Sequence, residues 1–525
     1  MPNDLYWLKD KGANLTWPDN NFEWDRPLII GEYGDPGSIP IEERTSFTGE
    51  SIYNFQLWRR TDVHGRDARQ SDMFDYLKRA TDVYRMQGVA VVNPWFGQGE
   101  DVMPVVAVRP VDFHPNFFSG STGTRKVVVF NDTRSHFSGM TLQSWLEVDG
   151  KTVWEKVIRS QVEPGRNGVF EIVFECPDYA QTTKATLLVR LRADMMGRES
   201  QIGRAALHQE TIYIVPQAKA TAADTGGVIL LDNTGATAKA LEQLGARIPA
   251  QSLLNAAALA KATILIIGAD TDAQPFRTVV DGFVRRGGRV IMLGQKYGIP
   301  LLSELAQTDD THVATRTWKR SYGHPIVKDV QDAQLSYWKP DNIVSTLTVQ
   351  KPVVGKSRAV IDAGGRFGLN WAPLLETPVG NGLVLQSQLN LVDRVAQEPL
   401  AGQLLLQMLR YSHTYESPVR PPLRVLVGNN DALKQVLAAT SIVTSPSLAA
   451  VSGAAEGPVL LDSSYKLSTA EVQQLKDFVA AGGKIWLHGF NSTNIASVAN
   501  LFPFKPVSSN LSTGITSSTR RSTTT

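Results

Sequence analysis

One stretch of this chain occurs twice, and the repeat limits the folds open to the second half of the sequence. Residues 263–294 align without gaps on residues 458–489, at an offset of 195 positions. Each copy predicts a strand, a helix, a Gly-Gly turn and a second strand, and a further strand precedes each copy, at 227–232 and 423–428. Since this alternation is typical of βαβ units, we expect two doubly wound α/β domains.

The glycine pairs of the repeat lie after the helices. Gly287-Gly288 and Gly482-Gly483 therefore suit a helix C-cap and a tight turn, whereas a phosphate cradle would precede a helix. The two copies resemble the flavodoxin-like or amidotransferase-like domains found at the C-terminus of many large glycosidases. Amidotransferase chemistry needs a nucleophilic cysteine, and neither copy contains one. We therefore expect a structural role, with homo-oligomer formation through these domains as one form of it.

A second informative stretch, RPLIIGEYGDPG, lies at residues 26–37. Its apolar run from Pro27 to Gly31 predicts a buried parallel strand, which ends on Glu32. A carboxylate at the C-terminal end of a barrel strand is where (β/α)8 enzymes hold their catalytic groups. The alternative interpretation is an ordinary strand end.

This pattern resembles the nucleophile strand of glycoside hydrolase family 2, the β-galactosidase and β-glucuronidase family. The resemblance implies that Glu32 is the catalytic nucleophile at the end of the seventh strand of a TIM barrel, and that Tyr33 supports substrate binding. Related retaining glycosidase families place a glutamate on the same strand. The resemblance therefore points to this group of enzymes more than to one substrate.

The residues after Glu32 predict the rest of a closing barrel. Residues 65–88 have the spacing of a helix, and residues 88–97 predict a strand that ends in Asn93-Pro94-Trp95. The resemblance implies that Trp95 forms a wall of the sugar site and that Asn93 contacts substrate, while the alternative places Trp95 in the barrel core. In the arginine-rich loop before this helix, Trp58 is a candidate for stacking on a sugar, although such a loop is often only surface.

Retaining hydrolysis needs a second carboxylate as acid/base, and the sequence near Glu32 offers no clear one. In the family this glutamate follows an asparagine, and no Asn-Glu pair precedes Glu32. A whole barrel takes about 250 residues. We therefore expect this chain to be the C-terminal part of a larger enzyme that shows little activity alone. The local carboxylates that remain as substitutes are Glu23, Glu42, Glu43, Glu50 and Glu100.

Residues 106–217 change to the short, strand-like runs of an all-β domain. The runs are 126–133, 141–158, 168–175, 184–193 and 210–216, and Asp149-Gly150 predicts a hairpin turn between Trp145 and Trp154. We expect an immunoglobulin-like β-sandwich in which the two tryptophans meet across the hairpin. Core packing explains these tryptophans better than carbohydrate binding does.

The overall composition is that of a multi-domain chain without a polyanionic partner. The formal net charge is +2, and we expect no nucleic-acid partner and no membrane span. Cys176 is the sole cysteine, the eight histidines show no metal-ligand spacing, and we expect no metal and no cofactor. The start of the chain lacks a signal segment, and the location stays open; for the full-length enzyme we expect an extracellular or periplasmic one.

These features predict a multi-domain chain of α/β and all-β domains. The expected segments are the C-terminal part of a (β/α)8 TIM barrel over 1–105, an immunoglobulin-like sandwich over 106–217, an amidotransferase-like α/β domain with inserted strands over 218–420, a second, partial copy over 421–507 and a disordered tail over 508–525. We predict a retaining β-glycosidase with a carbohydrate substrate. The alternative is a non-catalytic, carbohydrate-associated scaffold or oligomerisation module.

Overall fold

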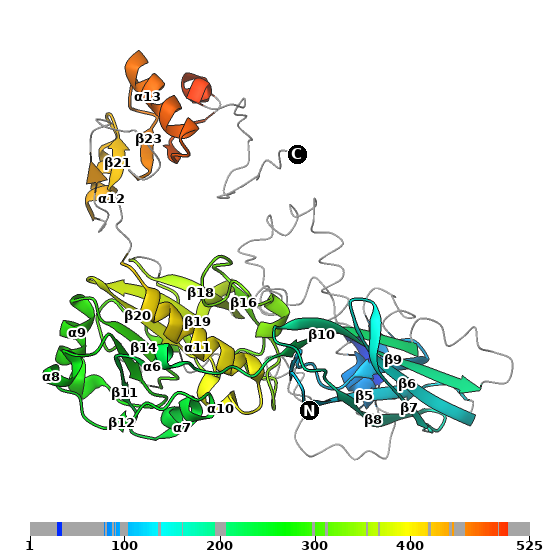
Figure 1. The fold of residues 1–525 in the computed structure, drawn as a ribbon. Coiled ribbons are helices and arrows are strands. Elements are labelled where there is room, and N and C mark those ends of the chain that lie inside the picture. The colour runs from blue at the N-terminus through cyan, green and yellow to red at the C-terminus, as the bar shows by residue number, and fades with distance from the viewer. Residues whose placement is uncertain are drawn as a thin grey trace. The chain divides into compact units, whose positions relative to one another are not determined.

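The fold is mixed α/β, and among the described residues strands outnumber helices. It divides into two compact units, Met1–Ser417 and Pro418–Thr525 (Figure 1). The computed structural model describes residues 29–33, 78, 81–86, 89, 91–94, 103–134, 138–159, 161–194, 206–296, 300–309, 313–352, 355–365, 368–417, 422–439, 444–445, 457–491 and 493–501. The mixed α/β and β-rich prediction is confirmed at this level, whereas the barrel and the immunoglobulin-like topology stay predictions.

The first described strands form a parallel pair. Strand β1 (Ile29–Tyr33) lies beside β2 (Val91–Pro94), with Ile29 opposite Val91 and Tyr33 opposite Pro94. Residues 81–86 between them are helical. A parallel pair with a helix in its connection is a βαβ unit, and the predicted strand–helix–strand order is confirmed.

Residues 106–215 form two sheets that share one core. The three-stranded sheet is β3 (Val106–Pro110), β5 (Thr122–Asn131) and β8 (Arg166–Glu175). The five-stranded sheet is β4 (Asn116–Phe118), β10 (Leu207–Val215), β9 (Thr183–Asp194), β6 (Ser138–Val148) and β7 (Lys151–Arg159). Because each strand alternates its faces, Val127 and Val129 of one sheet meet Leu187 and Val189 of the other in the core. The five predicted strand runs are confirmed.

The hairpin between β6 and β7 turns where the sequence predicts it. Asp149 and Gly150 both have positive φ, 49° and 74°, as a two-residue type I′ turn requires. The expected contact between the two tryptophans is wrong, because Trp145 lies opposite Glu155 and Trp154 lies opposite Leu146. Residues opposite one another share a face, so the two indoles point to opposite faces of the sheet.

A doubly wound α/β sheet follows. Its parallel strands have the order β12 (Ala250–Gln251), β11 (Val228–Leu231), β13 (Ile264–Ile267), β14 (Arg289–Leu293) and β20 (Gly382–Ser387). Numbered along the chain, this order is 2-1-3-4-5, that of flavodoxin-like folds. The predicted added strands complete the sheet on the β20 side and are β15 (Thr308–Asp309), β16 (Thr317–Lys319), β17 (Thr348–Gln350), β18 (Arg358–Gly365) and β19 (Gly368–Val379).

Helices cover both faces of this sheet, and the alternation along each strand divides its apolar residues between two cores. Ile264 and Ile266 pack with helices α7 (Ala236–Gln243) and α11 (Pro399–Thr414). Leu265 and Ile267 pack with α9 (Arg277–Arg285) on the other face. The shorter helical segments are α6 (Ala222–Thr225), α8 (Ala256–Leu259), η5 (Gln274–Phe276), η6 (Asp332–Leu335) and α10 (Leu391–Arg394).

Helix α11 is buried on more sides than its sequence pattern predicts. In the sequence, apolar residues spaced along one side predict an amphipathic helix here, with a stripe of Leu400, Leu404, Leu405, Met408 and Tyr411. Leu404 and Met408 of this stripe are buried. Leu406 and Leu409, which lie outside that stripe, are buried as well. The helix contacts both β14 of the α/β sheet and β4 of the sandwich. The second partner narrows the solvent-facing side of the helix to a polar stripe of Gln403, Gln407, Arg410 and Thr414, so the amphipathic prediction is only partly correct.

The second unit repeats the first four strands of this sheet. Strands β22 (Thr444–Ser445), β21 (Leu423–Leu426), β23 (Val459–Asp462) and β24 (Ile485–His488) lie in that order and are parallel. The helical elements are α12 (Asp431–Ala439), α13 (Thr469–Ala480) and η8 (Ile495–Leu501). At the offset of the repeat, β11 corresponds to β21, β13 to β23 and β14 to β24. The predicted second βαβ copy is therefore present.

The glycine pairs of the repeat end their helices in the same way. Gly287 and Gly482 have positive φ, 112° and 87°. The next amide nitrogen reaches back to the last helical turn, from Gly288 to the Phe283 carbonyl at 3.0 Å and from Gly483 to the Phe478 carbonyl at 2.8 Å. This is a Schellman motif in both copies, and the predicted C-cap is confirmed.

A buried polar contact joins the sandwich to the first α/β sheet. The Asn116 side chain on β4 donates through Nδ2 to the Gln334 backbone carbonyl at 2.9 Å, and its Oδ1 accepts from the Gln334 side-chain Nε2 at 3.2 Å. Glu398, the N-cap of α11, is buried near Asn116 and Lys339. Burial raises the pKa of the Glu398 carboxyl to about 8, although hydrogen bonds and the Lys339 charge act in the opposite direction.

Gly483→Ala should destabilise the second unit by about 1–3 kcal/mol, because the new Cβ would lie 2.4 Å from the Phe478 ring. Gly482→Ala should cost about 1–2 kcal/mol, because a side chain disfavours its positive φ. Hydrogen exchange of the whole chain, read over 459–489, measures both effects. Lys484→Ala in the same turn is the control, and unchanged exchange in Gly483→Ala would contradict the packing assigned to this glycine.

Glu398→Gln should remove a pH-dependent loss of stability. In the unfolded chain a glutamate titrates near pH 4.3, whereas folded Glu398 has a pKa of about 8. Between these values only the folded state keeps the proton, so its free energy of unfolding falls as pH rises, by at most about 1.4 kcal/mol per pH unit. Urea unfolding from pH 5 to 8 should give a shallower dependence in Glu398→Gln than in the wild type. The control Glu416→Gln, at an exposed site, should change nothing.

Candidate functional site

The edge where β1 and β2 end holds the predicted catalytic residue. Glu32 lies in the last part of β1, and Asn93 lies at the equivalent end of β2. Since the strands are parallel and Tyr33 lies opposite Pro94, both backbones reach the same edge of the sheet. Trp58 and Trp95 lie outside the described residues, and for Glu32, Tyr33 and Asn93 only the backbone is described.

This edge can present one carboxylate from the two strands. Glu32 is the sole acidic residue of β1, and β2 contains none. One carboxylate is enough for nucleophilic attack, whereas protonation of a leaving group needs a second one. Within β1 and β2, Glu32 is therefore the one carboxylate available for either role.

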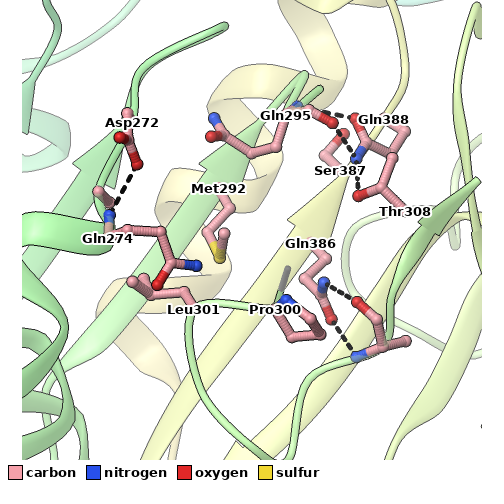
Figure 2. A pocket seen from close by; sticks show the side chains of 12 residues that line it. Asp272, Gln274, Met292, Gln295, Pro300, Leu301, Thr308, Gln386, Ser387 and Gln388 are labelled. Atoms are coloured by element: carbon pink, nitrogen blue, oxygen red, sulfur yellow. Dashed lines mark hydrogen bonds between the residues drawn. The ribbon is translucent and has the colours of Figure 1, made fainter. Parts of the chain in front are cut away.

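A small cavity opens at the carboxyl edge of the first α/β sheet (Figure 2). It encloses about 30 Å³ and is lined by amide side chains, among them Gln295, Gln386 and Gln388. Gln386 bonds both backbone groups of Ala306, and Gln388 bridges the Gln295 backbone and the Thr308 hydroxyl. These amides hold the segment after β14 against the sheet. A cavity of this size suits about one water and excludes a sugar.

A larger cavity, which we call the polar cavity, lies between helix 81–86, the sandwich and the Tyr337 loop. It encloses about 460 Å³, within the range of small-molecule sites. Two aromatic rings, Phe113 and Tyr337, are among its walls, with centroids 5.6 Å apart. Its charged or titratable residues are Lys78, Asp82, Arg109, His208 and Glu210.

Ion pairs fix the charges of the polar cavity. Arg109 lies 3.3 Å from Asp82, and the buried Arg125 guanidinium lies 2.7 Å from Glu210. Burial alone would raise the pKa of the Glu210 carboxyl, but Arg125 and His208 lower it below its usual value. Glu210 is thus held as an ionised hydrogen-bond acceptor. Sequence spacing gave no signal for this site, because its walls come from four separate segments.

Neither the single cysteine nor any metal-ligand cluster adds a second site among the described residues. Cys176 packs in the sandwich core, and burial raises the pKa of its thiol to about 11, which makes the reactive thiolate scarce. In the described part of the chain, no three His, Cys, Asp or Glu side chains gather as metal ligands would. Among the described helices, none has the length and apolar character needed to cross a membrane.

No protein family and no curated protein matches this chain. Solved structures match parts of it. A family 123 glycoside hydrolase from Clostridium perfringens is 11% identical over 26% of this chain and 32% of its own length, with a TM-score of 0.17. A cycloisomaltooligosaccharide glucanotransferase from Paenibacillus is 11% identical over 36% of this chain and 27% of its own, with a TM-score of 0.18. A CARDB domain from Pyrococcus furiosus is 9% identical over 21% of this chain and 90% of its own length, with a TM-score of 0.16.

These similarities are weak and partial. The chain spans about a third of the length of the Clostridium hydrolase. Two of these three structures are carbohydrate-active enzymes, but the TM-scores are too low to assign a fold or an activity to this chain. The functional interpretation therefore depends on the residues themselves.

Proposed function

We propose that this chain carries the nucleophile strand of a retaining β-glycosidase, with Glu32 as the nucleophile. The observation that supports the proposal is the parallel pairing of β1 with β2, which brings Glu32 and Asn93 to one edge. Enzymes with parallel barrels hold their reacting groups at that edge. The resemblance of RPLIIGEYGDPG to the family 2 nucleophile strand gives Glu32 its role.

The proposed reaction has two steps. A Glu32 carboxylate oxygen attacks the anomeric carbon, the bond to the leaving oxygen breaks, and a covalent glycosyl-enzyme forms. Water then attacks the same carbon and releases Glu32. In this scheme Tyr33 and Asn93 orient the sugar, and Trp58 and Trp95 offer aromatic faces to it.

The proton donor of the first step is a separate requirement. A retaining enzyme places it about 5–5.5 Å from the nucleophile, and removal of such a group typically costs about 10²–10⁴-fold in rate. Neither β1 nor β2 supplies it. An ordinary glycoside, whose leaving group needs protonation, is therefore a poor test of Glu32 in this chain.

A substrate that needs no proton donor tests Glu32 directly. We expect 2,4-dinitrophenyl 2-deoxy-2-fluoro-β-glycosides of galactose or glucose to label the chain slowly, because dinitrophenolate leaves unprotonated and the fluorine stabilises the covalent product. Mass spectrometry should place one fluorosugar on the peptide that contains Glu32. Glu32→Gln should abolish the label, and Glu163→Gln in the sandwich should not. Absence of label from both sugars, or label on another carboxylate, would reject Glu32 as the nucleophile.

Carbohydrate binding without hydrolysis is the second candidate function, and the polar cavity favours it. A volume of about 460 Å³ accommodates a monosaccharide, and Phe113 and Tyr337 offer ring faces next to the ionised Glu210. Aromatic faces pack on the C–H surface of a sugar, while carboxylate and guanidinium groups bond its hydroxyls.

Tyr337→Leu should weaken binding of methyl β-D-galactopyranoside or methyl β-D-glucopyranoside by about tenfold, because the aromatic wall is lost. Saturation-transfer NMR of the whole chain measures this binding. Tyr322→Leu removes an exposed tyrosine that does not line the cavity and is the matched control. Equal binding by both variants would place any sugar site elsewhere.

A further inference from the structure

The two α/β copies share their scaffold but differ at one edge, where the parallel strands end. In the first copy, β13 ends on Ile267 and β14 ends on Leu293, and both side chains are buried in apolar cores. The corresponding residues of the second copy are Asp462 and His488. The fold is built with apolar residues at these positions, so the scaffold itself does not require the acid and the imidazole.

Asp462 lies at the centre of a polar cluster in the second copy. Its Oδ2 accepts from His488 Nδ1 at 2.7 Å and from Asn430 Nδ2 at 3.1 Å. Its Oδ1 accepts from the Ser464 amide at 3.0 Å and from the Ser464 hydroxyl. Its side chain is 1% exposed, whereas that of His488 is 50% exposed. A buried carboxylate thus holds a half-exposed imidazole.

These contacts determine the tautomer of the neutral imidazole. Burial alone would raise the pKa of Asp462, but the hydrogen bonds that it accepts outweigh burial and lower its pKa to about 2. An ionised carboxylate can only accept, so His488 Nδ1 must carry the proton. His488 Nε2 then has a free lone pair, and no described residue bonds to it. The cluster therefore holds His488 Nε2 on a partly exposed ring, where it accepts a hydrogen bond if the ring is neutral and donates one if the ring is protonated.

The neighbouring groups are neutral and polar. Ser463 follows Asp462 and is partly exposed, and a Cβ on Gly489 would lie 2.8 Å from its hydroxyl oxygen, so a side chain at position 489 would crowd that hydroxyl. Asn430 caps α12 through the Leu433 amide at 3.1 Å while it bonds Asp462. The first copy has a different arrangement, in which Asp232 caps α7 through the Gly235 and Ala238 amides. That aspartate has a structural role and holds no histidine.

We propose that the carboxyl edge of the second α/β copy is a binding site for a neutral, hydroxyl-bearing small molecule, a sugar or a polyol, whose hydroxyl forms a hydrogen bond with His488 Nε2. Open α/β sheets bind ligands at this edge, beside the strand where the order reverses, and β21 and β23 are the strands at that point here. The negative charge of Asp462, which bonds the Nδ1 edge of the ring, disfavours an anionic ligand. The Ser463 hydroxyl can donate a hydrogen bond to a second ligand hydroxyl or accept one from it. This site is independent of Glu32 and of the polar cavity.

The chain has eight histidines, so selective labelling can report on His488 in the whole protein. We would label histidine Cε1 with carbon-13, assign the His488 signal with the His488→Gln variant, and add methyl β-D-glucopyranoside, glycerol or inorganic phosphate. We expect the glucoside or glycerol to move the His488 signal in a saturable way, and phosphate to leave it in place. The signals of His413 and His208, which lie in the first unit, serve as internal controls, and His208 reports on the polar cavity separately.

Variants separate a ligand site from a structural cluster. Asp462→Asn removes the carboxylate that fixes the tautomer and should weaken the response about fivefold to tenfold, the loss expected for one hydrogen bond. Glu32→Gln should leave it unchanged. A shift with phosphate alone would make this an anion site and overturn the proposal. The proposal is also overturned if none of the three probes moves the His488 signal in a protein whose cooperative unfolding transition shows that it is folded. Asp462 and its partners would then be a structural cluster only.

Discussion

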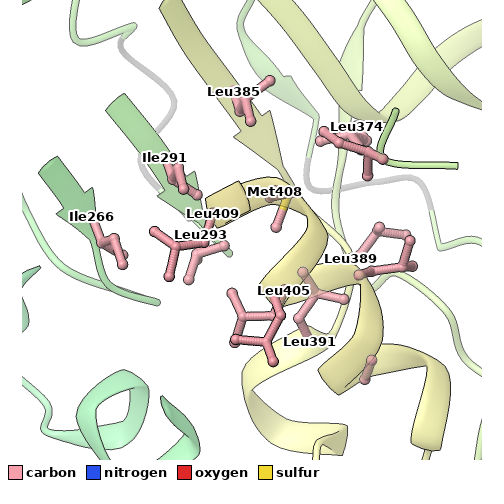
Figure 3. Close-up of a cluster of buried hydrophobic side chains, with 14 of the residues drawn as sticks. Ile266, Ile291, Leu293, Leu374, Leu385, Leu389, Leu391, Leu405, Met408 and Leu409 are labelled. Atoms are coloured by element: carbon pink, nitrogen blue, oxygen red, sulfur yellow. The ribbon is translucent and has the colours of Figure 1, made fainter. Parts of the chain in front are cut away.

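The burial of helix α11 is the interaction on which the first unit depends. One side of the helix packs on the α/β sheet, where Leu405, Met408 and Leu409 meet Ile291 and Leu385 (Figure 3). Its start lies beside β4 of the sandwich, so the same helix joins the two domains. The helix N-terminus is therefore enclosed by protein instead of water, and its cap, Glu398, must bond the Leu400 amide inside the structure. The cost of this arrangement is a buried carboxyl whose proton is held up to about pH 8.

Local patterns predicted the elements that are determined by neighbours in sequence. The apolar runs, the Asp149-Gly150 turn and the glycine pairs are examples, because strand period, turn conformation and helix ends depend on a few adjacent residues. The faces of Trp145 and Trp154 and the burial of Leu406 and Leu409 on α11 were not predictable in this way. They depend on register and on a second partner, β4, which lies about 280 residues before the helix. Amphipathicity describes one contact surface, so a helix with two partners departs from it.

The candidate sites differ in the same respect, because local sequence motifs predicted only one of them. The strand that contains Glu32 and its parallel partner were recognisable from short motifs, and their pairing follows from the strand–helix–strand order. The polar cavity was not recognisable, because Asp82, Arg109, Glu210 and Tyr337 come from distant segments and none lies in a motif. The same limit applies to Asp462 and His488. Each is an ordinary residue at a strand end until the sheet order puts the strands side by side.

An internal repeat provides a control that a single domain lacks. Both copies keep the glycine pairs and the phenylalanines that pack on them. Close packing explains this, because a Cβ on Gly288 or Gly483 would lie about 2.5 Å or less from a ring atom. Where one copy keeps apolar residues and the other buries an acid, packing alone is an insufficient explanation, because burial of a carboxylate costs free energy that leucine or isoleucine avoids. The hydrogen bond from the His488 imidazole offsets part of this burial free energy only while Asp462 stays ionised. The difference between the copies therefore separates what the fold requires from what the second copy has added to it.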